Sequence, residues 1–225
     1  MIEEVRKKVY ELLKNDDSGH GIAHIERVFN LSIKFAKKEN ADVEITSLIA
    51  LLHEVDDYKL FGEENAKNLT NAKRIMREVN IDKSIQKEVI AAIENFGYSK
   101  AIQGIRPRSL EGKIVSDADM CDAVGVNGLI RIFTYSLKYG KPFFDKNKFP
   151  NSYLEKNKKI CADSSVCHLF EKALKLKNMM LTSSGKREIE KRHNITVEML
   201  YQLFDEEDAE DWIKYLDDFL TEYYS

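Results

Sequence analysis

The sequence predicts an all-helical fold. Only 10 glycines and 3 prolines interrupt the 225 residues, and Lys, Glu, Leu and Ala are abundant, which favours helices. Apolar residues recur at steps of three and four along most of the chain, as an amphipathic helix requires. No segment shows the alternation of period two, bounded by turn residues, that is typical of a strand. We therefore expect an all-α protein.

The apolar steps place the helices one after another. In the first segment, Val5, Val9 and Leu12 form one stripe, and later segments repeat this spacing. The acidic run EEDAED at 206–211 is expected to begin the last helix, because carboxylates favour a helix N-terminus. Helices are predicted over residues 2–14, 22–38, 43–53, 66–79, 84–95, 109–120, 126–138, 153–181, 187–204 and 209–222.

One long loop divides the predicted helices. Residues 139–152 hold two of the three prolines and break the apolar period. The loop separates a core at about 15–138 from C-terminal helices at 153–225, which are expected to pack on that core. A chain of 225 residues can bury a substantial core without disulfides or a structural metal. We expect a single all-helical domain spanning residues 1–225.

The charge balance and the cysteines exclude several classes of protein. Thirty-five basic against 38 acidic residues give a net charge of −3, so nucleic acid is not an expected partner. No apolar run of about 18 residues exists, and MIEEVRKKVY has no signal-peptide core, so a cytoplasmic protein without a membrane segment is expected. Cys121, Cys161 and Cys167 match no zinc spacing and are expected to be free thiols. The apolar stripes on the last two helices can be buried within the chain or in an interface between two copies, so the protein is expected to be a monomer or a homodimer.

Histidines and carboxylates gather at three places in the chain. His20 and His24 are four residues apart, which places both on one helix face. His53 ends the apolar run SLIALL and is followed by Glu54, and SDADMCDAVG at 116–125 carries Asp119. Each cluster follows an apolar helix directly, and burying charge without a partner is costly. A metal site is one interpretation; packed histidines and solvated carboxylates, as is usual for a doublet such as 56–57, are the other.

Imidazole nitrogen and carboxylate oxygen together are the ligands of a hydrolytic divalent ion. A mixed set of this kind suits Mn, Fe, Co, Ni or Zn, whereas an all-oxygen set would suit Mg or Ca better.

Four segments of the chain resemble the successive motifs of the HD-domain metal-dependent phosphohydrolases. The last of them is similar to the C-terminal helix motif of a bacterial branch that includes nucleotide pyrophosphohydrolases. Four motifs in this order and spacing are a specific signal, and they span most of the chain, from about residue 15 to about residue 195. The segments are HGIAHIERV (20–28), LIALLHEVDDYKLFG (48–62), LEGKIVSDADMCDAVGVNGLIRIF (110–133) and HLFEKALKLKNMM (168–180).

The resemblance implies an all-helical fold with a divalent metal ion between helices. Its ligand pattern is a histidine, an adjacent His-Asp pair and a distant aspartate. Carried over by position, the metal ligands are His24, His53, Glu54 and Asp119. The implied ion is Mn, Fe, Ni, Co, Zn or Mg, with Mn favoured.

The same positions provide residues for catalysis and substrate binding. Asp57, on a further polar position of the family, is expected to orient a water molecule or act as general base, and Glu54 is the second catalytic candidate. Cationic side chains would neutralise phosphate oxygens. A solvated lysine and ordinary ion pairs are their alternative interpretations. The substrate-binding candidates are Lys59, Arg27, His20, Lys172 and Arg131.

The sequence departs from the family pattern at three places. Glu54 stands where the family has Asp, which adds one methylene and a reach of about 1.5 Å. Gly21 stands where the branch usually has Asp, and Met120 and Cys121 replace Arg and Leu. An arginine at the position of Met120 would be able to bind a phosphate group, so its replacement is expected to remove one phosphate contact.

The predicted function is metal-dependent hydrolysis of phosphoester or phosphoanhydride bonds in a small phosphorylated metabolite, with a nucleotide as the best guess. The alternative hypothesis is a catalytically retired module that keeps the HD fold for ligand binding or protein interaction, because Glu54 replaces the family's aspartate.

Overall fold

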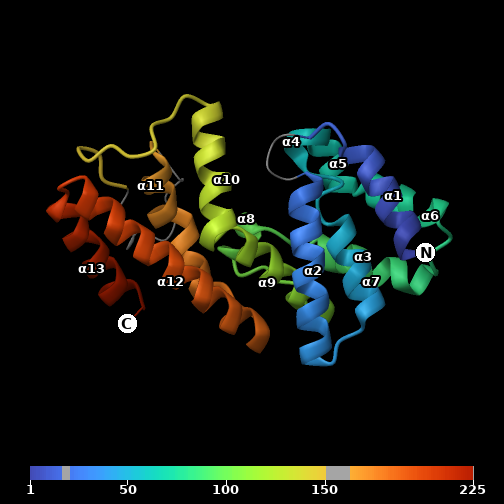
Figure 1. The fold of residues 1–225 in the computed structure, drawn as a ribbon. Coiled ribbons are helices and arrows are strands. Elements are labelled where there is room, and N and C mark those ends of the chain that lie inside the picture. The colour runs from blue at the N-terminus through green and yellow to red at the C-terminus, as the bar shows by residue number, and fades with distance from the viewer. Residues whose placement is uncertain (17–20, 151–162, 225) are drawn as a thin grey trace. The chain divides into compact units, whose positions relative to one another are not determined.

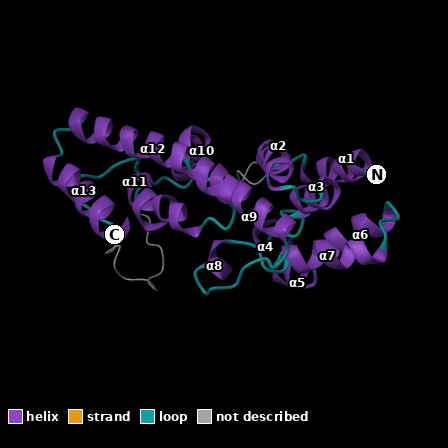
Figure 2. Ribbon diagram, turned by 90° about the horizontal axis from the view of Figure 1, so that it is seen from below, coloured by secondary structure: helices purple, strands orange, loops and turns teal. Residues whose placement is uncertain are grey.

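The computed structural model describes residues 1–16, 21–150 and 163–224, and every regular element in these ranges is a helix. Figure 2 shows these helices joined by loops. The all-α class predicted from the apolar spacing is therefore confirmed. None of the described helices is both long enough and apolar enough to cross a membrane.

Two compact units divide the chain. Unit 1 comprises residues 1–119 together with 181–185, and unit 2 comprises residues 120–180 and 186–225. The folding of both as a single domain stays a prediction.

Unit 1 is built around one apolar helix, α3 (Val43–Leu52), with α1, α2 and α7 packed on it (Figure 1). All residues from Thr46 to Leu52 are buried: the five from Leu48 onward are apolar, and the hydroxyls of Thr46 and Ser47 donate to backbone carbonyls one turn earlier. Asp42 caps its N-terminus by accepting hydrogen bonds from the amides of Glu44 and Ile45. The other helices of unit 1 are α1 (Ile2–Leu13), α2 (Ile22–Glu39), α4 (Tyr58–Phe61), α5 (Glu63–Asn68), α6 (Thr70–Glu78), α7 (Lys83–Ile93), α8 (Tyr98–Ala101) and α9 (Leu110–Asp122) as far as Asp119.

The predicted helix over 66–79 is wrong in one respect, because the structure breaks it into α5 and α6 at Leu69. Leu69 has φ of 49°, in the left-handed region, which costs an L-residue about 1–2 kcal/mol. The carboxylate of Asp56 offsets this cost. It is 6% exposed and accepts the amides of Asn71 and Ala72 at 2.8 and 2.9 Å, in the first turn of α6.

Unit 2 has an aromatic core. Phe170, Phe204, Trp212 and Phe219 are fully buried, and Phe149 stacks on Trp212 with 4.4 Å between ring centroids. Its helices are α10 (Gly125–Lys138), α11 (Ser165–His168), the π-helix η1 (Leu169–Ala173), the 3₁₀-helix η2 (Leu174–Met179), α12 (Ser183–Glu206) from Lys186 onward, and α13 (Glu210–Tyr224).

Several further predictions about the C-terminal half are tested by these helices. Residues 139–150 contain no helix, as expected for the long loop, while 151–162 lie outside the described residues. Glu210 and Asp211 form the acidic first turn of α13, as predicted. Cys121 and Cys167 are buried free thiols, and Cys161 is outside the described ranges.

Candidate metal centre

Four side chains from three parts of unit 1 bring their donor atoms together. His24 lies in the first turn of α2, His53 and Glu54 lie in the turn that follows α3, and Asp119 lies near the end of α9. One donor atom from each of the four lies within 4.8 Å of the others. These are the four residues for which the sequence predicts a shared metal ion.

The spacing of these atoms matches the size of a small divalent ion. Nε2 of His24 lies 3.4 Å from Oδ1 of Asp119 and 3.5 Å from Oε1 of Glu54. The Nε2 atoms of His24 and His53 lie 3.3 Å apart. Two atoms that each bind one ion at about 2.1 Å are separated by about 3.0–3.4 Å at the usual coordination angles. The three separations from Nε2 of His24 are therefore close to those around one ion of this class.

The imidazole of His53 is held ready to donate a lone pair. Its Nδ1 lies 2.8 Å from the carbonyl oxygen of Ala50, which fixes this nitrogen as the N–H donor and leaves Nε2 facing the cluster. Burial lowers the pKa of His53 below its usual value, although the charges of Glu54 and Asp119 act in the opposite direction. His53 is therefore neutral near pH 7, as a metal ligand must be.

The carboxylate of Asp119 is held in its ionised form. Burial would raise the pKa of Asp119, but the hydrogen bond and charge of His24, together with the charge of His53, lower it below its usual value. The side chain of Glu54 is only 12% exposed. Two carboxylates and two imidazoles in a largely buried cluster are a chemical match for one divalent cation.

The longer side chain of Glu54 still reaches the cluster. Its Oε1 lies 3.8 Å from Nε2 of His53, in addition to the contact with His24. The glutamate lies in the turn that follows α3, where the amide of Asp57 donates to its carbonyl at 3.1 Å. Its role as a ligand in place of aspartate stays a prediction.

The other candidates in unit 1 have different surroundings. Oδ1 of Asp57 caps α4 by accepting the amide of Lys59 at 2.9 Å. The Lys59 side chain is exposed, with its ammonium 5.9 Å from the centroid of the Tyr58 ring. Arg27 is half-buried on α2, and His20 lies outside the described residues. Their assignments to catalysis and substrate binding stay predictions.

Arg131 and Lys172 belong to unit 2. The guanidinium of Arg131 lies 2.8 Å from the carboxylate of Asp122 and also donates to the Asp122 carbonyl at 3.3 Å. A phosphate group would have to compete with this ion pair for the guanidinium of Arg131. Lys172 is half-buried in the π-helix η1. Their predicted contacts with phosphate oxygens are untested.

The structure shows the surroundings of two residues that depart from the family pattern, Gly21 and Met120. Gly21 is the N-cap of α2, and a Cβ there would lie 2.8 Å from the carbonyl oxygen of Asp16, so the close approach of the backbone favours glycine. Met120 is buried, with 6% of its surface exposed, in an environment suited to its apolar side chain.

Two buried carboxylates next to the cluster were not among the predicted site residues. Asp56 follows Glu54 by two residues, and Asp117 precedes Asp119 by two residues. Asp117 is fully buried, and its neighbours in space include the amides of Leu181 and Thr182. In the sequence, both are recognisable as carboxylates two positions from a predicted ligand, a spacing that does not place two side chains on the same face of a helix.

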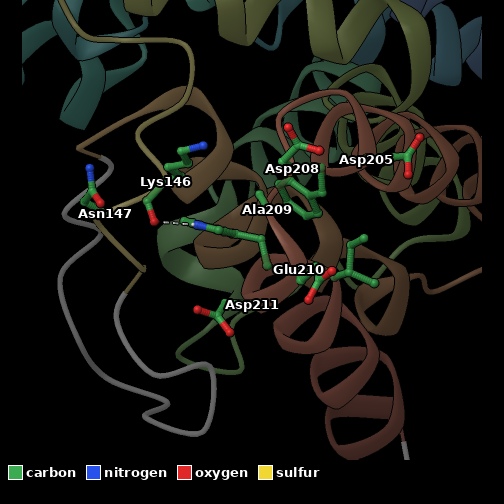
Figure 3. Close-up of a pocket in the computed structure, with 10 residues that line it drawn as sticks. Lys146, Asn147, Asp205, Asp208, Ala209, Glu210 and Asp211 are labelled. Atoms are coloured by element: carbon green, nitrogen blue, oxygen red, sulfur yellow. Dashed lines mark hydrogen bonds between the residues drawn. The ribbon is translucent and has the colours of Figure 1, made fainter.

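A separate hollow of about 430 Å³ lies in unit 2 (Figure 3). Its floor includes Trp212, whose Nε1 donates to the carbonyl of Lys146 at 3.0 Å. The four lining carboxylates are exposed, and Figure 3 shows them spread around the hollow rather than converging on one point. They are Asp205, Asp208, Glu210 and Asp211. Because its lining contains no histidine, the chemistry favours the cluster in unit 1 as the functional site.

The family model of the HD domain matches residues 21–124. A crystallised HD-superfamily hydrolase of Bacillus thuringiensis is 31% identical, with a TM-score of 0.73, and the match covers 92% of this chain and 97% of that one. The chain therefore belongs to the HD-domain phosphohydrolase superfamily.

Two other relatives extend the similarity over nearly the whole chain. A crystallised protein of Lactobacillus plantarum is 28% identical with a TM-score of 0.77, over 92% of this chain and 97% of its own. The protein YpgQ of Bacillus subtilis is 29% identical over 202 residues, which are 89% of this chain and 91% of YpgQ. The structure of YpgQ in complex with ADP matches with a TM-score of 0.69 and 27% identity, over 91% of this chain and 94% of its own.

Proposed function

We propose that this protein is a metal-dependent hydrolase of phosphoester or phosphoanhydride bonds in a small phosphorylated metabolite, and that the metabolite is a nucleotide. The observation that carries the proposal is the convergence of His24, His53, Glu54 and Asp119 to within 4.8 Å in unit 1. Mn is the favoured ion for this mixed nitrogen and oxygen set, with Fe, Co, Ni, Zn and Mg as alternatives.

The four residues would hold the ion through Nε2 of each histidine and one oxygen of each carboxylate. When bound, a divalent ion polarises a phosphoryl oxygen and makes water more acidic. The hydrogen bond from Nδ1 of His53 to Ala50 keeps the imidazole in the tautomer that this arrangement needs.

Asp57 is the proposed general base for the attacking water. Because Oδ1 accepts the amide of Lys59, we assign the proton to Oδ2. The water oxygen forms the new bond to phosphorus, the bond from phosphorus to the leaving oxygen breaks, and the proton passes to Oδ2. Lys59 and Arg27 are proposed to balance the charge of the phosphate oxygens.

The nucleotide is proposed as substrate because the relative YpgQ has been crystallised with ADP. The resemblance of 168–180 to the branch that includes nucleotide pyrophosphohydrolases supports the same substrate class. Lys172 lies in this segment and Arg131 in α10, and both are proposed to contact the substrate.

The test is hydrolysis of a panel of nucleoside mono-, di- and triphosphates with added Mn²⁺. We expect phosphate or pyrophosphate release by the wild-type protein and none by His24→Ala or Asp119→Ala. His193→Gln is the matched control, since it removes another buried histidine outside the cluster. A His24→Ala protein that hydrolyses nucleotides like the wild type would refute the site.

The retired module remains the second candidate, favoured by Glu54 in place of aspartate. It predicts no hydrolysis by the wild-type protein with any phosphorylated substrate. Gain of metal occupancy only in Glu54→Asp would support this alternative over the enzyme.

A further inference from the structure

We propose that Asp117 is a positioning residue for the metal centre: by locking α9 onto the segment 181–185, it aims the carboxylate of Asp119 at His24. This inference rests on the proposed metal site and adds a residue that is not itself a ligand.

The carboxylate of Asp117 accepts hydrogen bonds from one distant segment. Its Oδ1 and Oδ2 lie 2.9 and 3.1 Å from the amide of Leu181. Oδ2 also accepts the amide and the hydroxyl of Thr182, both at 2.7 Å. Asp117 is 0% exposed, so these donors replace water as its hydrogen-bond partners. A rotation of α9 would break these bonds inside the protein, where no solvent compensates for them.

Gly185 shows how closely the two segments fit together. A Cβ at this position would lie 2.2 Å from Oδ2 of Asp117, a distance that no real contact allows. The amide of Gly185 is itself used, since it donates to the hydroxyl of Thr182 at 3.0 Å. The backbone at Gly185 therefore lies directly against the carboxylate of Asp117.

The same segment is also attached to the helix that carries His24. Oε1 of Glu39, the last residue of α2, accepts the amide of Ser184 at 2.6 Å. The amides of Leu181 and Thr182, just before α12, are thus bound by a carboxylate from α9, and the amide of Ser184 in its first turn by a carboxylate from α2. These are two of the three elements that supply the metal cluster.

Because α9 is a helix, fixing Asp117 also determines the direction in which the side chain of Asp119 points. Residues two apart on a helix are turned by about 200° and raised by about 3 Å relative to each other. Fixing Asp117 on one side of α9 therefore directs Asp119 to the other side, where its Oδ1 lies 3.4 Å from Nε2 of His24. Ligand atoms tolerate errors of only about 0.2 Å, so a small turn of α9 is enough to weaken binding.

The experiment measures the affinity for Mn²⁺ by isothermal titration calorimetry on the full chain. Asp117→Asn removes the charge and places an NH₂ donor opposite at least one of the backbone amides that the carboxylate accepts. Thr182→Val removes the hydrogen bond from the Thr182 hydroxyl to Asp117 and the one that this hydroxyl accepts from the amide of Gly185. The side-chain volume changes little, and Asp117 keeps its charge. We expect the Kd for Mn²⁺ to rise by about 10- to 100-fold in both variants, the range found for residues that orient metal ligands.

Asp82→Ala is the matched control. Asp82 also caps a helix, α7, by accepting the amide of Ser84 at 2.7 Å, but it is exposed and α7 supplies no residue of the cluster. Its loss is expected to lower the melting temperature and to leave the Kd for Mn²⁺ unchanged. Circular dichroism identifies which variants fold. If Asp117→Asn does not fold, the Kd of Thr182→Val for Mn²⁺ decides the outcome.

The outcomes separate this inference from the proposed function. If Thr182→Val melts at a lower temperature but binds Mn²⁺ like the wild type, Asp117 has only a structural role and the inference fails. If the wild type binds Mn²⁺ and hydrolyses no phosphorylated metabolite, only the proposed function fails. A wild-type chain that binds none of Mn, Fe, Co, Ni, Zn or Mg would overturn both.

Discussion

The Nε2 atoms of His24 and His53 face each other at 3.3 Å, while the other nitrogen of His53 is engaged by the Ala50 carbonyl at 2.8 Å. His53 therefore offers a lone pair towards His24. Carboxylate oxygens of Glu54 and Asp119 complete the surroundings of the His24 nitrogen. A set of acceptors this close together is stable only with a proton or a cation among them.

Metal binding is expected to stabilise the fold measurably. A ligand at 100 times its Kd adds about 2.7 kcal/mol to the free energy of unfolding. For a chain of this size that corresponds to a rise in Tm of about 5–10 °C. Differential scanning fluorimetry with Mn²⁺ against EDTA tests this, and His24→Ala should show no rise. An equal rise in His24→Ala would place the ion elsewhere.

Shortening Glu54 to aspartate is expected to change metal affinity only modestly. Glu54→Asp withdraws the carboxylate by about 1.5 Å but keeps its charge, and the other three proposed ligands are unchanged. We expect Kd for Mn²⁺ and kcat/KM to stay within about tenfold of the wild type, a difference of about 1.4 kcal/mol. Glu54→Gln, which keeps the length and removes the charge, is the control and should bind the ion much more weakly. Equal binding by Glu54→Gln would contradict a ligand role for this carboxylate.

Removing Asp56 is expected to destabilise unit 1. Asp56→Ala leaves the buried amides of Asn71 and Ala72 without this acceptor. Each unsatisfied amide lowers the free energy of unfolding by about 1–3 kcal/mol. The exposed cap variant Asp82→Ala should cost about 1 kcal/mol. Urea denaturation of the metal-free proteins measures both. A smaller loss for Asp56→Ala than for Asp82→Ala would show that α6 does not depend on this cap.

The buried His193 is expected to weaken the fold at acid pH. Burial and the charge of Lys177 lower the pKa of His193 to about 4, below the value of about 6.5 for an unfolded chain. Between these values the unfolded state binds more protons, so the free energy of unfolding falls as pH decreases from about 6.5 to 4 and levels off below. The contribution of this group is about 2–3 kcal/mol.

His193→Gln provides the comparison for this pH dependence. Nε2 of His193 lies 2.7 Å from the hydroxyl of Tyr224, and a glutamine amide can replace this hydrogen bond without titrating. Denaturation at pH 7 and pH 4 should show a smaller loss in the variant than in the wild type. Parallel losses in the two proteins would contradict the role of His193.

Arg131 allows substrate binding to be separated from structural support. Arg131→Gln removes the charge opposite Asp122, whose side chain is only 2% exposed, so we expect a loss of about 1–3 kcal/mol in stability. If Arg131 also contacts phosphate, KM for the nucleotide rises as well. An unchanged KM with lower stability would restrict Arg131 to its ion pair.

The helices were predictable because their signal is local. Apolar steps in 43–53 and 126–138 depend only on neighbouring residues, and both helices are present. The break at Leu69 was not predictable in this way, since it depends on Asp56 in another turn of the chain. A periodic pattern does not report which buried carboxylate begins a new helix.

The candidate site followed from the sequence only through the order of its motifs. Composition identified His24, His53 and Asp119 as polar residues next to apolar helices, and the family resemblance joined them into one set. The partners of Asp117 at Leu181 and Thr182 could not be found, because no local pattern connects residues 64 positions apart. Asp122, the partner of Arg131, lies at the end of a different helix, so no helical period pairs these two residues.

Unit 1 is discontinuous in the chain, and this has a consequence for its biosynthesis. A ribosome makes residues 1–119 first, yet the segment 181–185 that belongs with them is added only after residues 120–180 have been translated. The nascent chain therefore holds all four donor residues long before it acquires the backbone amides that bind Asp117. The hydrogen bonds of Asp117 can form only after Leu181 and Thr182 have emerged from the exit tunnel.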